Sequence, residues 1–213
     1  MELQRSSNGR IPVVFILLLF LGPAVGYSQS GGEDAPYHVS FSASKNGGTM
    51  RFSGPKNSLA IDIVGDTIQT TDQPNYLVVD NLIVQASMVP LPGGVDGSQQ
   101  TVARQKEILS GYVGYEMDYF QKELKLATSG LKREWLTIGE RTFLMWTFHL
   151  DPPKGGKTSG SGNTIIGQIY LSVLWHDQVL DLNSALTDEK DAKRAKDLLQ
   201  RMGGSIRSVP PVK

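Results

Sequence analysis

Residues 151–163, DPPKGGKTSGSGN, contain a Gly156-Lys157-Thr158 triplet of the kind that closes a phosphate-binding P-loop. A P-loop also needs a glycine five residues before Gly156 and a helix directly after the motif. Position 151 is Asp151, and the chain continues as TIIGQIYLSVLW, whose apolar residues alternate as in a strand. We therefore predict that this segment is the tip of a hairpin and that it binds no nucleotide.

The two strands beside this tip can be paired by matching their apolar residues. Placing Trp146 opposite Ile169 gives one continuous apolar face, as a paired sheet requires. The other face then mixes polar and apolar groups, which is typical of a small-molecule cleft. On this basis the candidate ligand-binding residues are Thr147, Gln168, Tyr170 and Ser172, beside Phe143 and Met145, with Tyr112 and Tyr115 of a long helix as the opposite wall.

A simpler alternative stays open for each of these residues. The mixed face could be a sheet face covered by a helix, and the two tyrosines could lie at the boundary of the core. Gly111 and Gly114 in the same helix each cost it roughly 1 kcal/mol relative to alanine. They favour close packing of the helix on the sheet, a kink, or a functional hinge.

Two histidines lie near carboxylates that could complete a metal site. The groups are His149 with Asp151, and His176 with Asp177 and Asp181. In the predicted hairpin, however, His149 and His176 lie at opposite ends of the strands, roughly 30 Å apart at about 3.3 Å per residue. We therefore predict no shared metal and no cofactor.

Motifs for nucleophilic or metal-dependent hydrolysis are absent from the sequence. The chain has no cysteine, no Gly-X-Ser-X-Gly and no His-Glu-X-X-His. Glu116 with Asp118, or Asp62 with Asp66, could serve as acid/base pairs, but nothing in the sequence distinguishes them from solvated acids. No catalytic residue is assigned, and we expect that the protein is not an enzyme.

Residues 1–26 resemble an export signal. Arg5 and Arg10 precede the apolar run IPVVFILLLFLGPAVG, and Ala24 and Gly26 supply the small residues before a cleavage site at Tyr27. We expect a cleaved signal peptide (1–26) and a flexible lead-in (27–36), and we leave open an uncleaved anchor. The predicted location is the periplasm or the exterior of a bacterial cell.

Composition excludes some partners and favours a well-packed domain. Residues 1–26 carry Arg5, Arg10 and Glu2, which leaves 19 basic and 20 acidic residues and a net charge of −1. That balance gives no attraction for nucleic acid. Without cysteine there is no disulfide, so an exported chain must be stabilised by its core. We expect a single domain at 37–208, a tail at 209–213, and no membrane span in the mature chain.

Period-two apolar patterns alternate with two helical patterns. Strand patterns occupy HVSFSAS, TMRFS, SLAIDIVG and YLVVDNLIVQASMVP, with a turn or bulge at Asp80-Asn81, and return after residue 134. Helical spacing appears over 101–127 and from Thr187 to Gly203. The predicted fold class is α+β, a largely antiparallel sheet of about six to eight strands in the order ββββ-α-ββββ-α, with the helices packed on the sheet.

The closing sequence LTDEKDAKRAKDLLQRMGGSIRSVP has an amphipathic helix followed by Ser205-Ile206-Arg207. With the element order of residues 37–208, it resembles the Mog1/PsbP-like α/β/α domains of exported bacterial proteins. This resemblance implies a non-catalytic assembly, binding or regulatory module, and it assigns no functional residue.

These observations predict an exported, non-catalytic binding or accessory module that acts through a protein partner or a small ligand in the cell envelope. Two alternatives remain at this stage. One is a small-molecule or lipid carrier with a cleft between the long helix and the sheet. The other is a hydrolase without a recognisable motif.

Overall fold

The computed structural model describes residues 37–54, 57–73, 75–91, 96–151 and 164–210. The predicted signal peptide, the lead-in, most of the Gly-Lys-Thr loop and residues 211–213 lie outside these ranges. The elements before and including the first helix are β1 (His38–Ser44), β2 (Gly47–Ser53), β3 (Ser58–Val64), β4 (Ile68–Thr70), β5 (Tyr76–Val79), β6 (Leu82–Pro90), the short 3₁₀ helix η3 (Gly97–Gln99) and α1 (Val102–Lys122). They are followed by β7 (Thr128–Ile138), β8 (Arg141–Leu150), β9 (Gly167–Trp175), β10 (Gln178–Leu186), η4 (Glu189–Asp191), α2 (Ala192–Ser205) and β11 (Arg207–Ser208).

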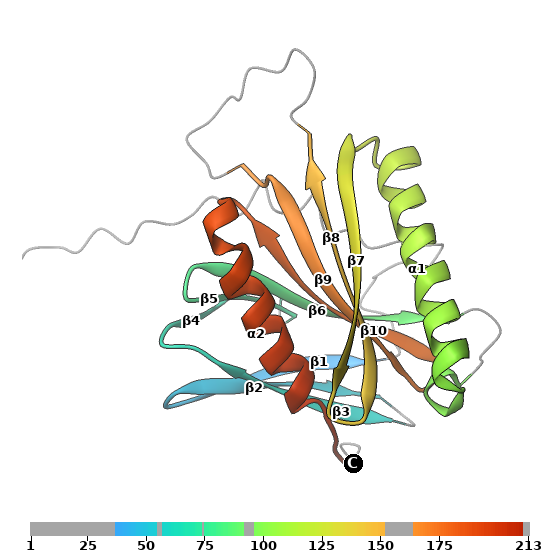
Figure 1. Cartoon of the computed structure of the whole chain (residues 1–213). Coiled ribbons are helices and arrows are strands. Elements are labelled where there is room, and N and C mark those ends of the chain that lie inside the picture. Colours follow the sequence, from blue (N-terminus) through green and yellow to red (C-terminus); the bar gives the residue numbers. More distant parts are fainter. Residues whose placement is uncertain (1–36, 55–56, 74, 92–95, 152–163, 211–213) are drawn as a thin grey trace, which may run out of the picture.

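The strands form two antiparallel sheets (Figure 1). The smaller sheet has the order β1-β2-β3-β11, and the larger has the order β4-β5-β6-β10-β9-β8-β7. The α+β class and the two helices packed on antiparallel strands are confirmed. The sequence predicted about six to eight strands in one sheet, whereas the described strands divide between two sheets.

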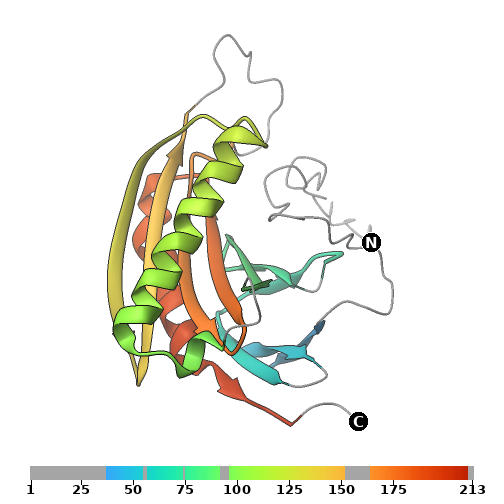
Figure 2. The ribbon, with the colours of Figure 1, turned by 90° about the vertical axis from the view of Figure 1, so that its right-hand side faces the viewer.

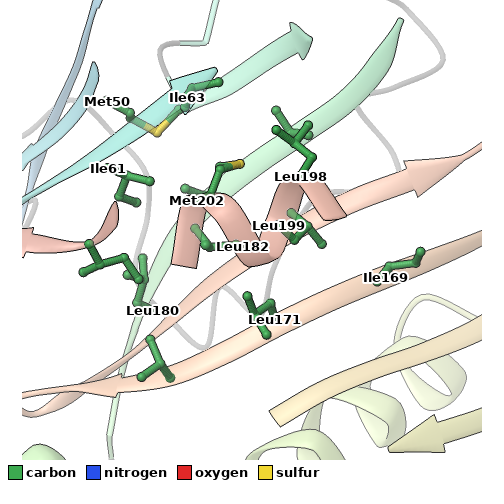
Figure 3. Close-up of a cluster of buried hydrophobic side chains, with 14 of the residues drawn as sticks. Met50, Ile61, Ile63, Ile169, Leu171, Leu180, Leu182, Leu198, Leu199 and Met202 are labelled. Atoms are coloured by element: carbon green, nitrogen blue, oxygen red, sulfur yellow. The ribbon is translucent and has the colours of Figure 1, made fainter. Parts of the chain in front are cut away.

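The two helices lie on opposite sides of the seven-stranded sheet (Figure 2). The four-stranded sheet shares one side with α2, and together they enclose the larger hydrophobic core. Figure 3 shows Leu198, Leu199 and Met202 of α2 among buried side chains of the neighbouring strands, such as Met50 and Leu171. Each of these side chains is at most 2% exposed, and burying one stabilises the fold by roughly 1.5–3 kcal/mol.

The Ser205-Ile206-Arg207 sequence joins α2 to the four-stranded sheet. Ser205 Oγ accepts a hydrogen bond from the backbone N–H of Asp62, at 2.8 Å, and Ile206 is buried. Arg207 forms an ion pair with Asp62, with Nη2 2.9 Å from Oδ1. The motif on which the resemblance rests therefore holds the C-terminal end of α2 against β3.

The hairpin around the Gly-Lys-Thr loop is confirmed, but its predicted register was wrong by one residue. β8 and β9 pair antiparallel, with Trp146 opposite Tyr170 and Thr147 opposite Ile169. Because side chains alternate between faces, a shift of one residue exchanges the faces of one strand relative to the other. Trp146 therefore shares a face with Tyr170, and Thr147 shares the other face with Ile169.

The first helix is continuous despite its two glycines. Thr101 caps it by accepting a hydrogen bond from Arg104 N at 3.3 Å, and the helix runs without a break to Lys122. A Cβ added at Gly111 or Gly114 would meet no heavy atom within 4 Å. Neither the close packing nor the break that the sequence suggested is present, because both glycines face away from the sheet.

We therefore expect Gly111→Ala to raise the free energy of unfolding by about 1 kcal/mol, since alanine restricts the unfolded chain and meets no clash. Gly203→Ala in α2 is the matched control. Its Cβ would lie 2.9 Å from Leu171 Cδ2 and 3.3 Å from the Phe143 ring, and should lower stability. Urea unfolding of both variants measures this, and equal effects at the two positions would contradict the packing described.

Candidate functional site

The sequence-nominated residues separate once the observed register is applied. Gln168, Tyr170 and Ser172 lie on the face of the seven-stranded sheet that α1 covers. Thr147 lies on the opposite face with Phe143 and Met145, where α2 packs. The prediction that Thr147 shares a surface with Tyr170 was therefore wrong.

A buried carboxyl group is the centre of the polar contacts under α1. Asp181, in the middle of β10, is 2% exposed. One of its oxygens accepts a short hydrogen bond from the hydroxyl of Tyr112 on α1, and the other accepts one from Ser172 on β9. Trp146 Nε1 on β8 donates to Ser172 Oγ at 2.9 Å. Four elements are thus linked through a single aspartate.

Aromatic side chains form the wall beside this chain of hydrogen bonds. The rings of Trp146 and Tyr170 stack with their centroids 4.0 Å apart and an interplanar angle of 10°. Phe120 of α1 packs on Phe148, with centroids 5.4 Å apart. Side chains with this much apolar surface lower the local polarity, which strengthens hydrogen bonds and penalises ionisation.

A second acid, Glu116 of α1, lies beside Asp181. Its side chain is 3% exposed, and its Oε1 has no hydrogen-bond partner among the described residues. The pKa of Glu116 is raised to about 8, chiefly by burial and also by the charge of Asp181, while hydrogen bonding to Tyr112 opposes the shift. Burial raises the pKa of Asp181 to about 6, against the opposing effect of the Ser172 and Tyr112 hydroxyls. For both carboxyl groups, burial favours the protonated form.

The remaining nominated residues have different environments. Tyr112, Tyr170 and Ser172 are brought together around Asp181, and Gln168 lies two residues from Tyr170 on the same face. Tyr115 is 49% exposed, on the side of α1 that faces away from the sheet. The other nominated residues on this face, Tyr112, Gln168, Tyr170 and Ser172, therefore form one layer between α1 and the sheet, and their own side chains fill it.

Sequence reasoning missed Asp181, Glu116 and Trp146 as members of one cluster. The available signal was positional. Asp181 interrupts the apolar run QVLDLNSAL of a fully buried strand, and Glu116 falls on the apolar stripe of α1 between Val113 and Phe120. An acid at such a position must find partners in the interior.

The acid pairs and histidines considered earlier do not converge. Asp118 is exposed and paired to Lys122 at 2.7 Å, on the far side of α1 from the sheet. His149 pairs with Gly167 at one end of β9, and His176 follows the other end. Within the residues that the structure describes, no group of three or more His, Cys, Asp or Glu is placed to hold a metal ion.

One hollow on the described surface lies away from this cluster, between α2 and the β5–β6 turn. It is lined by Asp80, Arg194 and Arg201 among others and has a volume of about 100 Å³. Small-molecule sites usually enclose about 300–1,000 Å³. Arg194 is already engaged with Asp191 and with the carbonyl oxygen of Asp80, at 2.7 Å each, so the hollow is a surface depression beside an ion-pair network.

Comparisons with known proteins bear on the fold alone. No protein-family model and no curated protein matches the chain. Among solved structures, cyanobacterial PsbP (CyanoP) from Synechocystis sp. PCC 6803 is similar, with a TM-score of 0.47 and 10% identity over 78% of this chain and 95% of that chain. That structure is a PsbP protein, the kind of domain that the sequence resembles. Among the described helices, none combines the length and apolar composition that a membrane crossing needs.

Removing the Tyr112 hydroxyl should release one oxygen of the Asp181 carboxyl from its only donor on α1. We expect Tyr112→Phe to lower the free energy of unfolding by about 2 kcal/mol, the usual cost of leaving a buried charged acceptor unpaired. Tyr115→Phe, on the exposed side of the same helix, should change it by less than about 0.5 kcal/mol. Chemical denaturation of both variants measures these free energies. A Tyr112→Phe variant as stable as the wild type would contradict a structural role for this hydrogen bond.

Stability should also fall as the pH rises. Both carboxyl pKa values are raised on folding, so between about pH 4 and pH 8 the folded protein binds more protons than the unfolded chain. We expect the free energy of unfolding at pH 8.5 to be below that at pH 5 by more than about 1.4 kcal/mol, the equivalent of one pKa unit. Glu116→Gln should flatten the profile, and an unchanged slope in that variant would exclude Glu116 as its source.

Proposed function

We propose that the protein is an exported, non-catalytic binding module that acts by docking to a protein partner in the cell envelope. The observation that carries this proposal is the state of the Asp181 carboxyl. Both of its oxygens accept hydrogen bonds from the chain's own hydroxyl groups, and the group is almost fully buried. A carboxylate held in this way fastens α1 to the sheet and has no free oxygen for a substrate.

The surface supports docking in preference to transport. Large apolar side chains that are at least 36% exposed occur on three described elements, and they are Val64, Val102, Tyr115, Leu131 and Trp135. Leu131 and Trp135 lie on β7, an edge strand of the larger sheet. In contrast, Tyr170, Gln168 and Ser172, which a carrier would need as the lining of a cleft, are at most 6% exposed.

A hydrolase is the second candidate, and one observation favours it. Two carboxyl groups with raised pKa values lie together under α1, and such perturbed acids are enriched at catalytic sites. Burial raises the pKa of Glu116 to about 8, the direction that a general acid requires. An enzyme would need α1 to move before a substrate could reach this pair.

Native mass spectrometry of the protein, purified gently from its own envelope, tests the proposal. We expect a chain that begins at Tyr27, together with a discrete complex of larger mass that contains one partner protein. The same complex should form with Glu116→Gln, because this acid lies inside the fold. Trp135→Ser changes the exposed edge strand, and its complex is compared with that of the wild type. Tyr115→Phe is the control for a conservative exchange at an exposed position.

Two results would contradict the proposal. One is a bare chain in every preparation, including those stabilised by cross-linking. The other is hydrolysis of any member of a panel of ester, glycoside and phosphate substrates that disappears in folded Glu116→Gln, since this outcome would establish the enzyme.

A further inference from the structure

β7 is the longest of the four edge strands that the structure describes. It has 11 residues, whereas β1 has 7, β4 has 3 and β11 has 2. In Figure 2, β7 (yellow) forms the outer margin of the seven-stranded sheet. An edge of this kind presents backbone N–H and C=O groups to which a further strand can pair.

The side chains of β7 are exposed on both faces of the sheet. Residues 129–135 are all exposed, so neither helix covers this stretch. Two of them are large and apolar, since Leu131 is 39% exposed and Trp135 is 36% exposed. Most proteins shorten or cover such an edge because it attracts other strands. An open edge of this length therefore indicates a partner strand.

Two features of β7 restrict which strand can pair with it. A bulge at Gly130, where φ is 66° and the register with β8 shifts, interrupts regular pairing at one end. Three consecutive charged residues, Lys132, Arg133 and Glu134, follow the bulge. Like charges directly opposite one another are unfavourable, whereas opposite charges are favourable. The partner strand must therefore carry an acid opposite Lys132 and a base opposite Glu134.

A second copy of β7 meets this requirement. When two identical strands pair antiparallel about a two-fold axis, one residue faces its own copy and the others pair symmetrically around it. With Arg133 at the axis, Lys132 lies opposite Glu134 of the second copy. In the same register Leu131 lies opposite Trp135 of the second copy, and each of the two pairs occurs twice. No other residue from 131 to 135 at the axis brings opposite charges together.

The faces of the sheet agree with this register. Lys132 and Glu134 lie on the side where α2 packs. Trp135 lies on the side of α1, where Lys106 Nζ is 5.3 Å from its ring. A two-fold axis perpendicular to the sheet keeps each side chain on its own face. The two charge pairs therefore form on the α2 side, and the two Leu131–Trp135 pairs form on the α1 side.

The contact at the axis is the unfavourable one, because the two Arg133 side chains face each other. Each guanidinium lies diagonally across from Trp135 of the second copy, within reach of a long side chain, and aromatic rings attract cations. Because regular pairing is confined to residues 131–135 of each strand, the association is weak and reversible.

We propose that β7 pairs antiparallel with β7 of a second copy, about a two-fold axis at Arg133. The two seven-stranded sheets then form one continuous sheet. This self-association is additional to the proposed docking and needs no other protein, and a partner that docks on β7 would compete with it.

Engineered cysteines test the register, because the chain has no cysteine of its own. At the axis, paired Cα atoms lie about 4.5–5.5 Å apart, within the range of a disulfide. Copies of Thr137, which is exposed on the same strand, would lie about eight positions apart, roughly 26 Å at about 3.3 Å per residue. Mild oxidation of the purified protein should therefore link Arg133→Cys into a dimer about tenfold faster than Thr137→Cys.

Exchange of the charged pair tests its contribution. Sedimentation velocity at pH 7.5 should show the wild-type protein shifting from monomer to dimer as its concentration rises from micromolar to millimolar. Lys132→Glu and Glu134→Lys each place like charges opposite one another and should each weaken the dimer about tenfold. The double variant restores opposite charges, and its dissociation constant should return to within about threefold of the wild-type value.

Three results would overturn the proposal. One is a wild-type protein that stays monomeric at millimolar concentration. Another is equal cross-linking of Arg133→Cys and Thr137→Cys, and the third is a double charge variant that associates no more tightly than the single ones. The changed side chains are all exposed, and circular dichroism checks that each variant folds. In native mass spectra a pair of copies has twice the mass of the chain, which distinguishes it from a complex with another protein, so the two proposals fail separately.

Discussion

Burial of the Asp181 carboxyl beneath α1 is the constraint on which the rest of this structure depends. A charged group in the interior is tolerated only when its lone pairs are satisfied. Tyr112 and Ser172 satisfy them here, and Trp146 in turn donates to Ser172. These donors come from α1, β9 and β8. The need to supply hydrogen bonds to one buried aspartate therefore fixes the position of α1 on the sheet.

The two sides of the seven-stranded sheet are stabilised in different ways. On the α2 side, apolar side chains of α2 and the four-stranded sheet fill the core. Polar contacts come from Ser205 and Arg207, at the C-terminal end of α2. On the α1 side, apolar contacts from Leu109, Val113 and Phe120 surround a polar centre. The first arrangement is stabilised by buried apolar surface, while the second places two acidic groups, Asp181 and Glu116, in the interior.

The sequence predicted the elements well and the pairing less well. Alternation located most strands, and the Asp80-Asn81 turn is confirmed, with φ values of 49° and 68° that suit a tight hairpin. The register of β8 and β9 was wrong because all nine residues of β9 are buried, so alternation could not tell its faces apart. The long connection between these strands gave no turn geometry to correct the choice. Asp181 and Glu116 could be seen as acids at apolar positions, but their convergence depends on how α1 crosses the sheet.

Amide hydrogen exchange can show whether the hydrogen bonds of Asp181 hold α1 on the sheet. The comparison is between the wild-type protein and Asp181→Ala at pH 7, with α2 as the internal reference. We expect α1 to lose protection by at least tenfold in the variant, whereas α2 keeps its wild-type protection. Unchanged protection of α1 in the folded variant would contradict the account, because the helix would then be held without the aspartate.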